Sequence, residues 1–226
     1  TASGAAADGS GPKRVTQRTT ICNTAGVPVG CSPNEFDGLQ DRLWLATGRG
    51  YRDVTERSGV AVADGKGLGI VAADLDRSGR LGLFIANDSV ANFLFLPSSA
   101  GDGKLFVQDG LRHGLAFDRE GRPQACMGIA VADADFDGRI DLFVTNFYNE
   151  ANVFYRQRST GQFFDATKAA GLSQTSWNLV GFGTQFIDGE LDGNPDLVLV
   201  NGHVDDFTKL GQPWRMKAQY FRNAGD

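Results

Sequence analysis

The feature that most restricts the fold of this 226-residue chain is an internal repeat. Three segments, residues 69–87, 128–146 and 183–201, align with one another without a gap and begin 59 and 55 residues apart. Each segment has a short run of small residues, then an acidic loop, then an aliphatic run that ends in Asn. Tandem segments of this kind predict a fold assembled from similar structural units that pack on their neighbours.

A second motif follows the same period. Residues 51–60 and 163–172 share an aromatic residue, an Asp, a Thr, a Gly and a final aliphatic residue at identical spacing. Residues 106–115 are a degenerate copy that keeps the aromatic residue, the Gly and the aliphatic residue. Apolar segments followed by Gly-containing turns lie between the two motifs, as at residues 92–96 and 152–155. This alternation of short apolar runs and turns favours an all-β architecture.

One repeat reads as four short strands. In the second copy these strands are predicted at residues 128–132, 142–145, 153–155 and 163–166. Four strands in a repeat of about 40 to 60 residues are typical of a β-propeller blade. The Gly-rich first strand suits the crowded innermost position of a blade. We expect a partial propeller of about three to four four-stranded blades, and a solenoid or β-helix, which usually has a shorter repeat, ranks second.

The acidic loop of the second copy places oxygen ligands at alternating positions. Asp133, Asp135, Asp137 and Asp141 supply carboxylates, and the Arg139 carbonyl stands between the last two of them. Alternation puts three carboxylates on one side of a tight turn, and the Gly after the third acid permits the bend. Such carboxylates repel one another unless a cation neutralises them, and an irregular, oxygen-rich shell suits Ca²⁺ better than Mg²⁺. The sequence therefore predicts calcium loops between strands.

The other two copies differ in how many of these ligands they keep. The third copy is complete, and its predicted ligands are Asp188, Glu190, Asp192, Asp196 and the Asn194 carbonyl. The first copy retains Asp74 and Asp76, but Ser78 and Gly82 replace the later acids, which predicts a weaker or empty site. An EF-hand would need a Glu at its twelfth position and flanking helices, whereas that position is aliphatic in every copy. The alternative interpretation is that these loops are ordinary Asp-Gly hairpin turns.

Composition argues against some classes of partner. The formal net charge is −5, and Lys and Arg form no basic patch along the chain. Nucleic acids and anionic membrane surfaces are therefore poor candidate partners. No apolar stretch approaches the roughly 18 residues that are needed to span a bilayer.

The three cysteines suggest an oxidising compartment. Cys22 and Cys31 lie in a loop-like stretch that contains Gly and Pro, which predicts a disulfide that closes a small loop. Two free thiols are the alternative. Cys126 stands beside a predicted strand and is expected to be a small buried apolar residue.

The two motifs resemble the FG-GAP, or VCBS, repeats of integrin-α-type propellers, and more narrowly the ASPIC/UnbV and cartilage-acidic-protein-like group. The resemblance rests on the pattern Asp-x-Asp-x-Asp-Gly-x-x-Asp-Leu-x-Val-x-Asn and on the trailing Phe-x-Asp-Val-Thr-x-x-x-Gly-Val pattern, and it covers roughly residues 20–226. It implies a calcium-binding β-propeller in a secreted or cell-surface protein. The chain departs from the group in holding fewer blades and in lacking the C-terminal ASPIC/UnbV module, so partner chains or further blades are expected to complete the ring.

These observations divide the chain into three expected parts. They are a linker or disordered arm at residues 1–18, a disulfide-bearing loop segment at residues 19–42, and propeller blades at residues 43–226 with repeats near 69–115, 128–172 and 183–226.

The expected function is binding by an extracytoplasmic module, whether secreted, periplasmic or on the cell surface. Rigid, calcium-stabilised blades would present loops to a protein or glycan partner, and no catalytic residue is expected. One alternative is a propeller-type lyase or hydrolase with a site near His203, and another is a structural assembly protein completed by partner chains. Trp44, Trp177 and Trp214 are expected to pack in the core or in hairpins rather than to be exposed.

Overall fold

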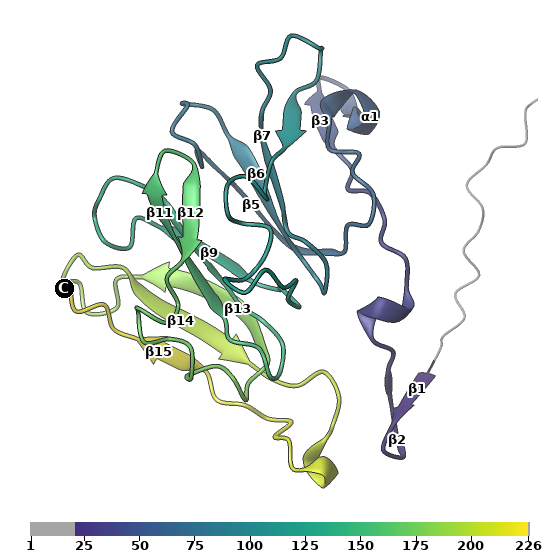
Figure 1. Ribbon diagram of the computed structural model, residues 1–226, viewed down its shortest axis with the longest axis vertical. Coiled ribbons are helices and arrows are strands. Elements are labelled where there is room, and N and C mark those ends of the chain that lie inside the picture. Colours follow the sequence, from purple (N-terminus) through teal and green to yellow (C-terminus); the bar gives the residue numbers. More distant parts are fainter. Residues whose placement is uncertain (1–20, 226) are drawn as a thin grey trace, which may run out of the picture. The chain divides into compact units, whose positions relative to one another are not determined.

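The computed structural model describes residues 21–225, which form five small antiparallel sheets with little helix (Figure 1). The all-β class predicted from the sequence is confirmed. The chain divides into two compact units, residues 1–31 and 32–226. The expected linker at residues 1–18 lies outside the described residues. In the first unit, a two-stranded hairpin is formed by β1 (Ile21–Thr24) and β2 (Val27–Gly30).

Three sheets of the second unit correspond to the three repeats. Sheet I has the strand order β5 (Gly67–Ala73), β6 (Gly82–Asn87), β7 (Phe93–Pro97) and β8 (Phe106–Gln108). Sheet II has the order β9 (Ile129–Ala132), β10 (Asp141–Val144), β11 (Val153–Ser159) and β12 (Gln162–Asp165). Sheet III has three strands, β13 (Gly181–Ile187), β14 (Asp196–Asn201) and β15 (Gln219–Phe221). The four strands predicted for the second repeat are thus confirmed.

A further hairpin precedes sheet I in the chain. It consists of β3 (Trp44–Thr47) and β4 (Gly50–Asp53), in which every residue is exposed. The helices in residues 32–225 are short, namely η1 (Pro33–Glu35), α1 (Thr55–Ser58) and η2 (Thr208–Leu210). No helix among the described residues is long and apolar enough to cross a membrane.

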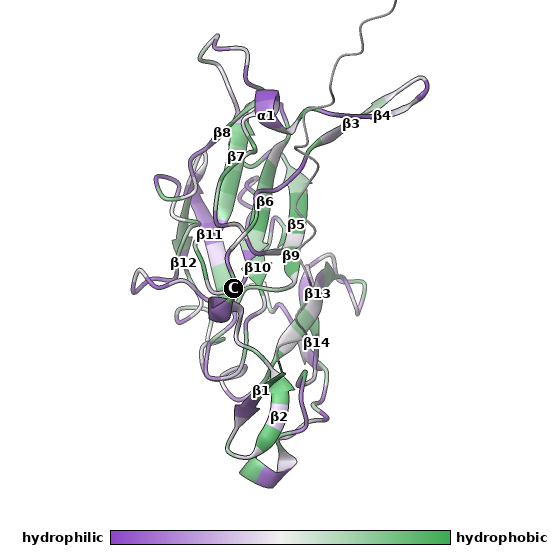
Figure 2. Cartoon of the chain, turned by 90° about the vertical axis from the view of Figure 1, so that its right-hand side faces the viewer, coloured by the Kyte–Doolittle hydropathy of each residue, from purple (hydrophilic) through white to green (hydrophobic). Residues whose placement is uncertain are grey.

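Sheets I and II pack face to face through one apolar cluster. Phe84 from sheet I meets Leu142, Val144 and Tyr155 from sheet II, and these four side chains are at most 1% exposed. Figure 2 shows the hydrophobic character of β6 and β7, which supply much of this face of sheet I. Burial of large apolar side chains on this scale is the main source of stability for such a fold.

Sheets II and III repeat the same packing. Phe143, which occupies the repeat position of Phe84, packs with Ala130 against Leu197 and Leu199 of sheet III. Successive side chains of a strand point to opposite faces. Leu142 therefore packs at the interface with sheet I, and its neighbour Phe143 packs at the interface with sheet III. One packing mode, set by the alternation in the second strand of each repeat, is therefore used twice.

The first strands of the three sheets approach one another closely, β5 beside β9 and β9 beside β13. A Cβ atom placed on Gly69 would lie 2.4 Å from the Met127 carbonyl oxygen, and one on Gly128 would lie 2.0 Å from the Phe182 carbonyl oxygen. Only glycine permits such contacts between backbones. The predicted crowding of the Gly-rich first strand is therefore confirmed, and it results from the strand of the next sheet.

We predict that Gly128→Ala destabilises the protein by about 2 to 3 kcal/mol, because the added methyl group forces β9 and β13 apart. Gly183 is the matched control, since a Cβ atom there would meet nothing nearer than Val200 Cγ2 at 3.5 Å. Gly183→Ala is expected to change the free energy of unfolding by less than about 1 kcal/mol. Urea denaturation of both variants measures the difference, and equal losses would contradict the proposed packing of the first strands.

Candidate metal site and neighbouring surfaces

The acidic loop between β9 and β10 brings three carboxylates together. Asp133, Asp135 and Asp137 each place a ligand oxygen within 4.8 Å of the others. The loop turns sharply at Phe136 and Gly138, which have φ values of 58° and 78°. A positive φ costs conformational free energy at Phe136 but not at Gly138. The backbone conformation therefore explains the Gly in the motif. The predicted gathering of alternate acids on one side of the turn is found here.

The same turn is present in all three repeats. In the second copy, the Asp133 carboxylate accepts hydrogen bonds from the backbone N–H groups of Asp137 and Gly138 at 3.0 and 2.8 Å. Asp74 does the same for Ser78 and Gly79 in the first copy, and Asp188 does so for Asp192 and Gly193 in the third. The first acid of each loop therefore holds the turn in shape, even in the copy that has lost other acids.

The last acid of the motif has a different environment from the first three. The Asp141 side chain is fully buried, and its two oxygens accept the N–H groups of Ala134 at 3.2 Å and of Gln157 at 2.9 Å. Asp196, its counterpart, accepts those of Gly189 and Asn223 at 3.0 and 2.8 Å. These carboxylates tie the loop to the third strand in sheet II and to the residues just after the third strand in sheet III. Burial raises the pKa of the Asp141 carboxyl to about 6, against the effect of these hydrogen bonds.

The first repeat has lost both partners of this contact. Gly82 replaces the acid, and Pro97 stands at the repeat position of Gln157 and Asn223. Proline has no N–H group to donate, so an acid at position 82 would have no such partner. Sequence reasoning noted the loss of the acid but missed the proline, which aligning the third strands of the repeats would have revealed.

Arginine side chains lie against the acids of the second loop. Arg156 forms an ion pair with Asp135, and Arg139 forms one with Asp137. The sequence assigned Arg139 a role through its carbonyl alone. These two guanidinium groups partly neutralise the cluster, so a metal ion would compete with them for the carboxylates.

In the third loop, the Glu190 carboxylate interacts with an arginine and a tyrosine. It pairs with Arg222, and the Tyr220 hydroxyl donates to one of its oxygens at 2.6 Å. Arg222 also reaches Asp192 at 3.3 Å. Among residues 21–225, the three-acid grouping found in the second loop does not recur in the first or third loop. The structure thus singles out the second loop, whereas the sequence ranked the second and third as equal.

His203 is enclosed by aromatic rings. It is 7% exposed, and its ring lies 4.7 Å from that of Phe207 and 5.3 Å from that of Phe147. Its Nδ1 accepts the Asp205 N–H at 3.2 Å. Burial lowers the pKa of His203, which favours the neutral imidazole.

The prediction for the tryptophans is wrong. Trp44, Trp177 and Trp214 are 51%, 42% and 46% exposed. Trp44 lies on the exposed β3–β4 hairpin, and the other two lie in segments between strands. Hydrophobicity alone therefore does not predict whether these three side chains are buried.

Trp177 lies at a polar cavity of about 500 Å³. The residues that line this cavity include Glu120, Arg122, Asn149, Glu150, Lys168 and Trp177. The Asn149 N–H donates to the Trp177 carbonyl at 2.9 Å, and the Glu150 carboxylate accepts the Ala125 N–H at 2.9 Å. These hydrogen bonds fix the loops that form the walls. Burial raises the pKa of Glu150.

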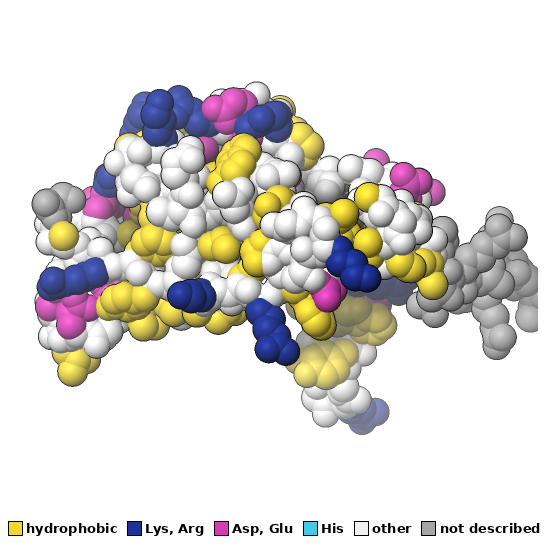
Figure 3. All heavy atoms as spheres, turned by 90° about the horizontal axis from the view of Figure 1, so that it is seen from below, with side chains coloured by type: hydrophobic (Ala, Val, Ile, Leu, Met, Phe, Trp, Pro, Cys, Tyr) yellow, Lys and Arg dark blue, Asp and Glu magenta, His cyan; other side chains and the backbone are white. Residues whose placement is uncertain are grey.

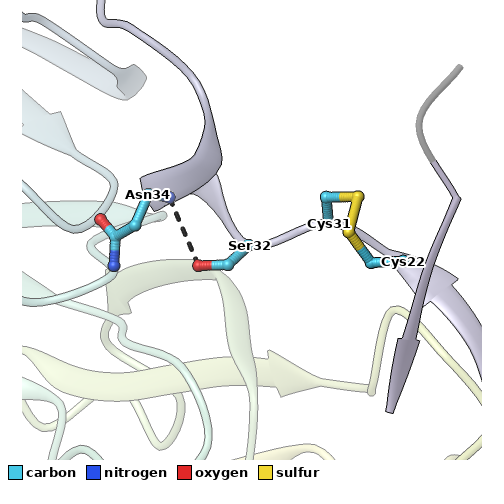
Figure 4. The surroundings of a disulfide bond; sticks show 4 residues. All are labelled: Cys22, Cys31, Ser32 and Asn34. Carbon is cyan, nitrogen blue, oxygen red and sulfur yellow. Dashed lines mark hydrogen bonds between the residues drawn. A yellow bond between two sulfur atoms is a disulfide. The ribbon is translucent and has the colours of Figure 1, made fainter. Parts of the chain in front are cut away.

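The predicted disulfide is present. Cys22 and Cys31 are bonded, and they close the hairpin formed by β1 and β2 (Figure 4). Cys126 is a free thiol that is 1% exposed, as expected, and its burial raises its pKa to about 12. A thiol of this kind is unreactive and acts as a small apolar side chain.

No protein-family model matches the chain, and no curated protein matches it.

We predict that Asp141→Ala destabilises the protein even in the presence of a chelator. Two backbone N–H groups lose their acceptor, which costs about 2 to 4 kcal/mol. Asp102→Ala is the control, because Asp102 accepts the Lys104 N–H at 3.1 Å in an exposed turn and its loss is expected to cost less than about 1 kcal/mol. Thermal unfolding in chelator measures both. A loss for Asp141→Ala that appears only with calcium would show that this residue acts as a ligand alone.

Proposed function

We propose that this protein is a calcium-stabilised, extracytoplasmic binding module built from FG-GAP-like repeats. The observation that carries the proposal is the convergence of Asp133, Asp135 and Asp137 in a loop between two strands. Carboxylate and carbonyl oxygens are the donors that Ca²⁺ prefers, and the Arg139 carbonyl lies in the same loop. These residues fit a calcium ion, which would neutralise the cluster and stiffen the loop.

The stiffening would act on more than one turn. The Asn223 side chain donates to the Ala134 carbonyl at 2.8 Å, and Ala134 lies between two of the candidate ligands. The loop of sheet II is therefore bonded to the end of sheet III. An ion held in the loop would stabilise the contact between the two sheets as well as the loop itself.

An extracytoplasmic location is supported by the Cys22–Cys31 disulfide, because such bonds persist in oxidising compartments. A binding role is supported by the polar cavity beside Trp177. Its exposed indole offers an apolar face, and the surrounding carboxylates, amides and cations offer many hydrogen bonds, a combination that suits a glycan or a polar protein loop. The surface in Figure 3 mixes hydrophobic patches with charges of both signs, which favours a specific contact over steering by net charge.

The enzyme alternative has less support. His203 was its candidate residue, and the aromatic contacts of this side chain favour a packing role. We therefore propose binding without catalysis.

Calcium is expected to raise the melting temperature relative to chelator. At a calcium concentration of a hundred times the dissociation constant, one site contributes about 2.7 kcal/mol. Calorimetric titration should give a stoichiometry that falls by one in Asp137→Asn, while Asp76→Asn should leave it unchanged. Arg156→Gln should tighten calcium binding, because it removes the cation that competes for Asp135. An unchanged melting temperature in calcium would refute the metal part of the proposal.

Trp177→Ala is expected to weaken ligand binding by at least about tenfold, since Trp is among the residues that most often carry a large share of binding energy. Trp214→Ala is the matched control, because Trp214 is equally exposed but lies away from the lining of the cavity. Immobilised neutral oligosaccharides and extracellular proteins, screened with and without calcium, provide the ligand. Equal losses in the two variants would place recognition elsewhere on the surface.

A further inference from the structure

The aliphatic run in each of sheets I and II ends in a buried Asn that closes the loop after it. The Asn87 N–H donates to Asn92 Oδ1 at 2.8 Å, and the Asn146 N–H donates to Asn152 Oδ1 at 2.8 Å. In both loops the side-chain amide nitrogen of the first Asn also donates to the carbonyl group just before the second Asn. Both first Asn residues are fully buried. The two loops are therefore held by the same pair of hydrogen bonds.

A third hydrogen bond of this Asn differs between the two sheets. Asn87 Oδ1 accepts the Lys66 N–H at 2.9 Å. Ala125 occupies the repeat position of Lys66, but its N–H donates to the Glu150 carboxylate at 2.9 Å. Asn146 Oδ1 is buried and has no hydrogen-bond partner among the described residues. A buried acceptor without a donor lowers the stability of the folded state, so this arrangement requires a physical explanation.

The loop of sheet II that supplies this carboxylate is one residue longer than its counterpart. Residues 147–151 separate the two Asn residues there, against residues 88–91 in sheet I. Glu150 lies in the longer loop and is partly buried. The neighbouring Asn149 N–H donates to the Trp177 carbonyl at 2.9 Å. The loop that carries Glu150 therefore also holds Trp177, which lines the polar cavity of about 500 Å³.

Two oxygen atoms in sheet II compete for one donor. Sheet I shows that an Asn oxygen at this position reaches the N–H group that Glu150 takes in sheet II. An ionised carboxylate only accepts hydrogen bonds, so it cannot satisfy Asn146 Oδ1. A protonated carboxyl group keeps an acceptor oxygen for the Ala125 N–H and gains an O–H donor for Asn146 Oδ1. One proton would therefore complete the hydrogen bonding of this cluster.

The charges around Glu150 favour the uptake of that proton. Burial raises the pKa of Glu150, and the carboxylates of Asp88 and Asp118 act in the same direction. Arg122 also interacts with Glu150, but its guanidinium group is paired with Asp118 at 2.8 Å. The other titratable groups around the loop and the cavity are those of Lys66, Arg119, Glu120, Cys126, Asp165 and Lys168.

We propose that Glu150 is a proton switch in the wall of the cavity, which when protonated bridges the Ala125 N–H and Asn146 Oδ1 and fixes the loop at residues 147–151. Because this loop also holds Trp177, proton uptake would preorganise the cavity for a neutral ligand. Regulation of binding by this switch rests on the proposed function of the cavity. The switch itself needs neither ligand nor calcium, so it can fail or succeed independently of that function.

The first test is thermal unfolding of Glu150→Gln, because a Gln amide imitates the protonated acid with one acceptor oxygen and an NH₂ donor. Near neutral pH the variant should melt about 2 to 4 °C higher than the wild type, the shift expected for one added buried hydrogen bond. A raised pKa in the folded state means that the wild type loses stability as pH rises through it. The difference should therefore vanish below the ordinary pKa of Glu, where the wild type is also protonated.

Glu120→Gln is the matched control, because Glu120 lines the same cavity but its side chain is 52% exposed. This change should leave the melting temperature unchanged or slightly lower at every pH, since exposed ion pairs contribute little to stability. An unchanged or lower melting temperature of Glu150→Gln near neutral pH would overturn the proposal, as would an equal rise in both variants.

A second measurement separates the proposed hydrogen bond from an effect of burial alone. In a carbon NMR titration of the wild type, the shifts of Glu150 Cδ and Asn146 Cγ should change with one shared midpoint, and Glu150→Gln should abolish the step at Asn146. Hydrogen exchange at residues 147–151, corrected for intrinsic rates, should be slower below that midpoint. A titration of Glu150 to which Asn146 does not respond, or a loop that exchanges equally on both sides of the midpoint, would contradict the switch.

Discussion

The close packing of consecutive sheets is the constraint on which the rest of this structure depends. Phe84 and Phe143 use the same repeat position to face the next sheet, and the glycines of the first strands let backbones touch. Side-chain amides then cross the interface, since Gln157 donates to the Leu75 carbonyl at 2.6 Å and Asn223 to that of Ala134. The first and second acidic loops therefore lie at the junctions between sheets, where a change in one loop affects two sheets.

The negative charge of the acidic loop in sheet II can be neutralised in two ways. Arg156 and Arg139 already pair with Asp135 and Asp137, and a divalent cation would attract the same oxygens more strongly because its charge is doubled and it can touch several at once. The buried Asp141 takes little part in that competition, since its oxygens hold backbone N–H groups. Asp141 thus braces the backbone alone, whereas Asp133 both shapes the turn and belongs to the candidate metal cluster.

Much of the fold could be predicted from local patterns. The spacing of the acidic motif, the small residues before it and the aliphatic run after it led to the strands now seen as β9 and β10. The exposure of Trp44 could not be predicted, because hydrophobicity alone does not say whether a second layer covers a hairpin. The joint change to Gly82 and Pro97 was missed because the two positions lie on neighbouring strands and no single motif contains both.

The sequence by itself determined the turns and strands, because Asp-Gly loops and alternating apolar runs act through residues a few positions apart. It also determined which acids could approach one another in each loop. Only the tertiary structure decided which of them meet and which brace the backbone, because those outcomes depend on contacts such as that between Leu75 and Gln157, 82 residues apart. Such contacts form only when two separately specified sheets pack with their faces matched.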